Sequence, residues 1–315
     1  MASREPTRPA PAPPAPARPP SRRALVPLLV LALLLAHLLL GGPRRAAAAP
    51  PAPAVVPAVV PAVVPAVVGA HGVPGGTLAV AVSALVPVAP GLTQQALDGS
   101  RDRFVLRTAD NGDAAGRPLP TASLVKLFLA EDLLHRARAG TVALGERDWR
   151  LLQDMVSASD DPAASELWDR FDGPQMVRDV AARYGLSGTA PPADPTQWGE
   201  TTTTARDLAR FLATLRRVAD PADAATLLSW MSTATPIAAD GFDQRFGVFG
   251  TAPPSTAVKQ GWMCCLGGQR HLHSVGVVDG RAVVLLSEVP RGVSYDRARA
   301  ALTAAAAALP SSDPG

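Results

Sequence analysis

TASLVKLFLAEDLLHRARAG, residues 121–140, is the most informative stretch of this sequence. Its first half is apolar all round, which predicts a buried helix over Ser123–Ala139, and Gly140 suits the position just after a helix end. Ser123 and Lys126 are three residues apart and therefore share one helix face. A helix N-terminus offers free N–H groups and positive potential, which stabilise an alkoxide or oxyanion. Ser123 is thus a candidate nucleophile, and Lys126 a candidate base if burial lowers its pKa.

Lysine is rare in this chain. Of 30 basic residues only Lys126 and Lys259 are Lys, and the other 28 are Arg. Arg can serve wherever a surface cation is enough, whereas Lys is needed where an amine must lose its proton or act as a compact charge. The two lysines are therefore candidates for chemistry.

Two further motifs contain polar residues of interest. Ser159-Asp160-Asp161 stands before Pro162, where an N-cap followed by Pro at the start of a helix explains Asp161 equally well. Lys259-Gln260-Gly261 comes at the end of an expected strand, where a charged residue at a sheet edge is common. Each motif alone is weak evidence for a site.

Together and in this order, the three motifs resemble the Ser-x-x-Lys, Ser-Asp-Asn and Lys-Thr-Gly set of class A β-lactamases and penicillin-binding proteins. The resemblance covers nearly all of residues 77–309, and the run at 198–208 (WGETTTTARDL) looks like the segment that follows the active-site loop in those enzymes. It implies that Ser123 is acylated, Lys126 assists as base and Ser159 relays the proton.

The same resemblance implies how substrate is bound. Lys259 would hold a substrate carboxylate, and the backbone N–H groups of Ser123 and Trp262 would form the oxyanion hole. Asp161, Gln260, Gly261 and Trp262 are the substrate-binding candidates. The expected substrate is a β-lactam or an acyl–D-Ala-type amide, such as a peptidoglycan stem peptide, and no cofactor or metal is expected.

The sequence also departs from the family pattern. Asp161 replaces an amide, Gln260 replaces a hydroxyl, and Trp262 is much bulkier than the usual small residue. The Glu-x-x-Leu-Asn loop that supplies the deacylating base is missing, and the acids between residues 186 and 201 are Asp194 and Glu200. The competing hypothesis is therefore a catalytically impaired envelope protein that keeps the fold and binds peptidoglycan or a partner.

The order of expected elements predicts an α/β (α+β) fold, with an antiparallel sheet flanked by helices plus a helical lobe. Asp279-Gly280 is a hairpin signal between two of the strands. The expected strands are Thr77–Val86, Arg103–Thr108, Ala257–Cys265, His271–Val278 and Arg281–Val289. Besides the helix at 123–139, the expected helices are Glu146–Val156, Pro162–Phe171, Pro174–Tyr184, Ala205–Arg217, Pro221–Ser232 and Tyr295–Leu309.

The N-terminal part suggests export. A basic, Pro-rich segment (1–23) precedes an apolar run, Ala24–Gly42, that suits either a membrane anchor or a signal peptide. We expect an uncleaved anchor with the domain outside, or a secreted protein if the signal is cleaved. Pro43–Gly76, with its Ala-Val-Val-Pro repeat, predicts an extended polyproline II linker, and residues 77–309 form the domain before a tail at 310–315.

Composition excludes some functions. From residue 77 onward 23 basic residues face 26 acids, so the domain lacks the basic surface of a nucleic-acid-binding protein.

Cys264 and Cys265 are adjacent, which does not suit a metal site; we expect two buried free thiols, with a vicinal disulfide as the alternative. His271 and His273 share one strand face, and we expect them to pack in the core or to face water. The Trp residues outside the motifs, Trp198 included, are expected to pack against helices. A monomer is expected.

Overall fold

The computed structural model describes residues 63–87 and 104–310. The predicted anchor at Ala24–Gly42 lies outside the described residues. Within the described ranges, no helix has both the length and the apolar character needed to cross a membrane.

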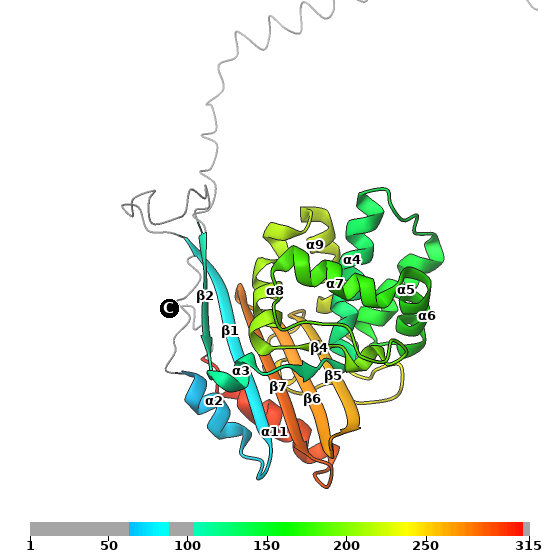
Figure 1. The fold of residues 1–315 in the computed structure, drawn as a ribbon. Coiled ribbons are helices and arrows are strands. Elements are labelled where there is room, and N and C mark those ends of the chain that lie inside the picture. The colour runs from blue at the N-terminus through cyan, green and yellow to red at the C-terminus, as the bar shows by residue number, and fades with distance from the viewer. Residues whose placement is uncertain (1–62, 88–103, 311–315) are drawn as a thin grey trace, which may run out of the picture. The chain divides into compact units, whose positions relative to one another are not determined.

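A five-stranded antiparallel sheet forms the centre of the fold, in the order β2-β1-β7-β6-β5 (Figure 1). All four pairings are antiparallel, as predicted. Asp279 and Gly280 join β6 to β7 with positive φ angles of 49° and 75°, which confirms the predicted hairpin turn. The strands are β1 (Thr77–Pro87), β2 (Phe104–Asp110), β5 (Ala257–Leu266), β6 (Gln269–Val278) and β7 (Arg281–Pro290). A small second sheet pairs β3 (Leu119–Pro120) with β4 (Thr202–Thr203).

Helices cover both faces of the large sheet (Figure 1). The lobe on one face contains α4 (Val125–Arg138), α5 (Glu146–Ser157), α6 (Asp161–Phe171), α7 (Gly173–Tyr184), α8 (Ala205–Val218) and α9 (Pro221–Ser232). The other face carries α2 (Val64–His71), α10 (Val248–Thr251) and α11 (Tyr295–Ala307). Short elements are α3 (Asp113–Gly116) and the 3₁₀ turns η3 (Ala122–Leu124) and η4 (Trp198–Glu200).

Alternation of side chains along the strands produces two separate cores. On β7, Val284 and Leu286 belong to the core under the helical lobe, whereas Val283 and Leu285 belong to the core under α2 and α11. Because both faces are buried, the strands are apolar on both sides.

Helix α2 corrects the prediction of an extended linker. It begins inside the Ala-Val-Val-Pro repeat, with Pro65 in its first turn, where a missing N–H costs nothing. Val64 and Val67 are buried in the core under α11, and His71 Nε2 lies 2.8 Å from Ser287 Oγ on β7. The extended conformation is therefore wrong for residues 64–71, and packing of the fold extends N-terminal to Thr77.

A chain that begins at Thr77 should be less stable than one that begins at Val63, by about 2–4 kcal/mol. The shorter chain loses two buried Val side chains, worth roughly 3–6 kcal/mol, and leaves the apolar core against which they pack uncovered. Urea unfolding of the two chains measures the difference. Equal midpoints and slopes would show that α2 contributes no stability.

Candidate active site

The segment that carries Ser123 is held tightly from both sides. Ser123 lies in η3 immediately before α4 and is 5% exposed. Thr121 N donates to Thr201 O at 2.7 Å, and Ala122 has a φ of 46°, a backbone conformation that L-residues seldom adopt. The Ser123 hydroxyl is thus presented at the start of a buried helix, as the sequence predicts.

The three motifs meet at Ser159. Lys126 Nζ donates to Ser159 O at 2.7 Å and lies 3.4 Å from Ser159 Oγ. Lys259 Nζ donates to the same Oγ at 2.7 Å. Both amines are buried, at 0% and 1% exposure. The structure therefore brings Lys126, Ser159 and Lys259 together across separations of up to 133 residues in the chain.

Burial lowers the pKa of both lysines. For Lys126, desolvation is the main cause, and the Asp161 carboxylate opposes it. Lys259 is completely enclosed, and its pKa falls well below the usual value because of desolvation and the nearby Lys126 charge. Since the two amines share one hydroxyl, protonation of one disfavours protonation of the other. A neutral amine, which a base requires, is thus favoured here.

Asp161 is not the N-cap of α6. Asp160 caps the helix by accepting from Ala163 N at 2.8 Å, whereas Asp161 accepts a hydrogen bond from Lys126 Nζ and forms an ion pair with it. Among the described residues the Ser123 hydroxyl makes no hydrogen bond. Asp161 therefore competes with Ser123 for the amine of Lys126.

Asp161→Asn should shift the pH dependence of any Lys126-dependent reaction towards lower pH. The Asp161 charge raises the pKa of Lys126, so its removal lowers that pKa and neutral amine becomes available in more acidic solution. The acylation rate measured from pH 5 to 10 should rise with pH at a more acidic midpoint than in wild type. Asp160→Asn removes one negative charge at the neighbouring position. The Asp160 charge has a smaller coulombic influence on Lys126, so this variant should shift the pH midpoint less. An unchanged or more alkaline midpoint would contradict this assignment.

Strand β5 presses its edge against the nucleophile segment. A Cβ on Gly261 would lie 2.9 Å from Thr121 O and 3.2 Å from Ser123 N, so this position has no room for a side chain. Gln260 O accepts from Lys259 Nζ at 3.1 Å. Peptide groups of alternate strand residues face the same edge, so the N–H of Trp262 is expected to face that edge too. This is where the oxyanion-hole prediction requires it.

The side chains of Gln260 and Trp262 do not join the cluster. Gln260 is buried on the opposite sheet face, with Nε2 3.5 Å from Ser274 Oγ. Trp262 stacks on Phe242 at 4.6 Å and donates to Asp240 at 3.2 Å. Strand alternation thus turns these two side chains away from Lys259 and Gly261.

Trp198 is the site residue that sequence reasoning missed. Predicted as a helix-packing residue, it lies in η4, and Lys126 Nζ sits over its ring, 5.0 Å from the centroid. Its indole N–H donates to Ser165 Oγ at 3.1 Å. The only available signal was its position at the start of the 198–208 run.

The acidic residues considered as a deacylating base make no hydrogen bond or ion pair with Lys126, Ser159 or Lys259 in the described part of the chain. Asp194 is in an exposed loop and accepts from Thr196 N and Oγ1. Glu166, on α6, forms ion pairs with Arg147 and Arg170. No hydrogen bond joins Glu200 to the lysine cluster within the described part of the chain. Nor does any group of three or more His, Cys, Asp or Glu residues there suit a metal ion.

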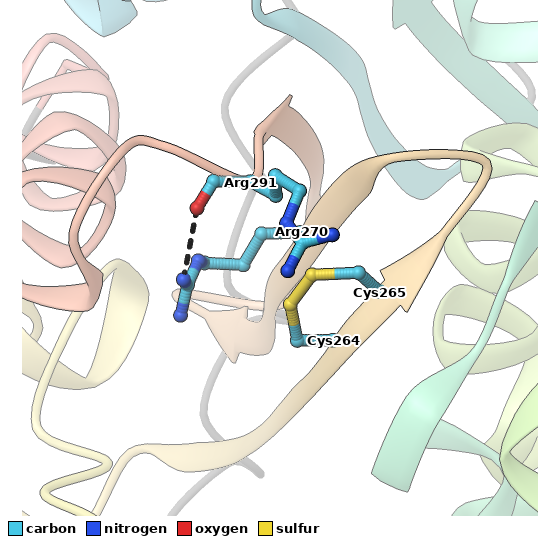
Figure 2. The surroundings of a disulfide bond; sticks show 4 residues. All are labelled: Cys264, Cys265, Arg270 and Arg291. Atoms are coloured by element: carbon cyan, nitrogen blue, oxygen red, sulfur yellow. Dashed lines mark hydrogen bonds between the residues drawn. A yellow bond between two sulfur atoms is a disulfide. The ribbon is translucent and has the colours of Figure 1, made fainter.

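The cysteines correct another prediction. Figure 2 shows Cys264 and Cys265 joined by a disulfide near the end of β5, beside Arg270, which donates to Arg291 O at 3.1 Å. Cys264 is exposed and Cys265 half-buried, so two buried free thiols is wrong. The β5–β6 pairing shifts register between Cys264 and Leu266, so regular alternation, which would separate the side chains, does not apply there.

This chain is similar to known proteins in sequence and in fold. The family described as "Beta-lactamase enzyme family" matches residues 149–311, which include Ser159 and Lys259 but begin after Lys126. "Putative lipoprotein LppW" of Mycobacterium tuberculosis and of Mycobacterium bovis is 38% identical over 209 residues, 65% of this chain and 66% of theirs. The match thus spans slightly less than two thirds of these relatives.

Solved β-lactamases share the fold. The enzyme from Chitinophaga pinensis aligns with a TM-score of 0.58 at 14% identity, covering 77% of this chain and 96% of that one. The enzyme from Sphaerobacter thermophilus aligns with a TM-score of 0.55 at 18% identity, covering 79% and 96%. At these identities the likeness concerns the fold alone.

Proposed function

The chain belongs to the β-lactamase enzyme family, and from this membership we propose that it is a serine hydrolase that forms an acyl-enzyme through Ser123. The observation that carries the proposal is the convergence of Lys126 and Lys259 on Ser159, while Ser123 lies in η3 immediately before the helix that carries Lys126. A scaffold without chemistry has no need of two buried amines with lowered pKa values.

The proposed acylation uses these residues in order. Neutral Lys126 takes the proton of Ser123 as Oγ attacks the substrate carbonyl carbon. The N–H groups of Ser123 and Trp262 bind the oxyanion. When the C–N bond breaks, the Ser159 hydroxyl gives its proton to the leaving nitrogen, and a protonated lysine next to Ser159 replaces it. The product is an ester on Ser123.

The proposed substrate is a β-lactam or an acyl–D-Ala-type amide, on the basis of the three motifs and the family. Intact-mass spectrometry after incubation with benzylpenicillin tests it: the protein should gain the mass of one whole penicillin. Ser123→Ala should gain none, whereas Ser232→Ala, a serine at the end of α9 whose hydroxyl donates only to Ser229 O, should react like wild type. Equal labelling of wild type and Ser123→Ala would assign the nucleophile to another residue.

A second candidate is a catalytically impaired family member that binds peptidoglycan or a partner. The observation in its favour is that Lys126 bonds to Asp161 and Ser159 rather than to the Ser123 hydroxyl. It predicts no covalent adduct with any penicillin, together with sedimentation of the domain with isolated peptidoglycan.

We infer an extracytoplasmic location at the cell membrane. The relatives named LppW are described as lipoproteins, but the only cysteines here are Cys264 and Cys265, so Ala24–Gly42 would provide the attachment in place of a lipid. Fractionation of cells that express the full chain, with and without residues 24–42, tests this; recovery of both forms in the cytoplasm would contradict it.

A further inference from the structure

A cavity with apolar walls and a few polar groups adjoins the segment that carries the proposed nucleophile. It has a volume of about 330 Å³, at the small end of ligand pockets. Pro120, Pro191, Pro192, Ala193 and Leu266 form its apolar walls, and Glu200, Thr202, His271 and Glu288 contribute its polar groups.

Three contacts connect this cavity to the site. Pro120 stands three residues before Ser123, and its carbonyl lies 2.8 Å from His273 Nε2. Thr201, which stands between Glu200 and Thr202, accepts from Thr121 N. Leu266 ends β5, the strand whose Gly261 touches Ser123 N. The cavity therefore adjoins both the segment that carries Ser123 and the end of β5.

His271 is a buried acceptor without a partner. It is 2% exposed, and neither ring nitrogen has a hydrogen-bond partner within the described residues; Nδ1 lies 3.8 Å from Glu288 Oε1. Burial lowers the pKa of His271, against the opposing influence of Glu288 and the Leu266 carbonyl. Burial therefore favours the neutral form of this ring, which lines the same cavity as Glu200.

The charge in the cavity is negative. The carboxylate of half-buried Glu200 has no ion pair or hydrogen bond with any described side chain or backbone group, and it lines the cavity. Burial alone would raise the pKa of Glu288, but Arg117 outweighs it and lowers that pKa, so Glu288 is ionised and already paired. Glu200 is thus the carboxylate that remains for a ligand, and an anionic group would be repelled.

We propose that this cavity is a subsite for an aliphatic ammonium group on the acyl part of the substrate. The apolar walls take the methylene chain, while the Glu200 carboxylate accepts a hydrogen bond from the ammonium and His271 lines the cavity. The inference deepens the proposed function and rests on it where acylation is concerned. The two claims are separable, because the cavity can bind an amine even when Ser123 does not react.

A matched pair of thiophenyl esters tests the subsite. In both, Ser123 Oγ would form a bond to the acyl carbon, the C–S bond would break, and thiophenol would leave after Lys126 takes the serine proton. The 6-aminohexanoyl ester carries an ammonium where the heptanoyl ester carries a methyl group. Wild type should acylate at least about tenfold faster with the amine ester, a difference that one charge-assisted hydrogen bond can supply.

Variants locate the source of the preference. Glu200→Gln keeps the shape of the side chain without its charge and should abolish the preference. Asp194→Asn removes a carboxylate from the same loop but outside the cavity, so it should keep the preference. Equal rates for the two esters in wild type, or a preference that survives in Glu200→Gln, would overturn the proposal.

A binding measurement covers the case in which neither ester reacts. Titration with hexylamine should shift the His271 ring signals in NMR spectra of wild type, identified by their loss in His271→Gln, and 1-hexanol should not. Shifts without acylation would support the subsite and refute the acyl-enzyme. Acylation with equal ester rates and no shifts would refute the subsite and support the acyl-enzyme.

Discussion

Lys126→Arg should slow acylation of Ser123 by roughly a thousandfold, nearly as much as Lys126→Ala. A general base contributes about 10²–10⁴ to a rate, and Arg cannot serve as one because its guanidinium stays protonated in proteins. Lys126 is fully buried and bonded to Ser159 and Asp161, so a guanidinium there would keep the charge and lose the base. Time-resolved intact-mass measurements with benzylpenicillin give the rates.

The second lysine supplies the matched control. Lys259→Arg should keep part of the activity if Lys259 acts mainly by charge and position, whereas Lys259→Ala should lose several kcal/mol of transition-state stabilisation, of the order reported for removal of an oxyanion donor. Thermal melts of all four variants check that they fold. Acylation that survives in Lys126→Arg would show that Lys126 acts by charge alone.

Hydrolysis of the acyl-enzyme should be slow, so that the ester on Ser123 persists for minutes to hours. Deacylation needs a water activated by a second base. The family loop that supplies this base is missing, Asp194 is bonded to Thr196, and the ring of Trp198 lies beside Lys126. Stopped-flow traces should show a burst of one equivalent followed by little turnover.

Two isosteric variants test whether a base has been overlooked. Asp194→Asn and Glu200→Gln should leave the lifetime of the ester unchanged if neither acid activates the water. Turnover of penicillin at tens per second with no accumulating adduct would contradict slow hydrolysis. Loss of that turnover in one of the two variants would then identify the base.

Much of the fold could be predicted from local patterns. The strands and helices after Gly76 follow from period-2 and period-3.6 alternation, and their ends follow from Pro, Gly and Asp at caps and turns. The candidate nucleophile and its lysines were found because Lys is so rare here that its two positions could be compared with motif spacing. These features depend on neighbouring residues and on covalent geometry, which a sequence displays directly.

The predictions that needed correction depended on contacts between distant segments. Helix α2 forms because Val64 and Val67 find the second face of the sheet, which the polyproline-like repeat does not display. Gln260 would have been assigned to the far face had strand alternation been applied to the motif itself. Cys264 and Cys265 departed from the prediction at a register shift set by the pairing with β6.

The sequence by itself determined the element order, the antiparallel class and the identity of Ser123, Lys126, Ser159 and Lys259 as candidates, because residue type, spacing and periodicity carry that information. Only the tertiary structure decided that Asp161 bonds to Lys126, that Trp198 lies beside the same amine, and that Glu200 and His271 share a cavity. The physical reason is that these contacts join segments 35 to 72 residues apart in the chain. Packing of the helices and loops around the sheet decides which residues meet in these contacts, and no local sequence pattern specifies that packing.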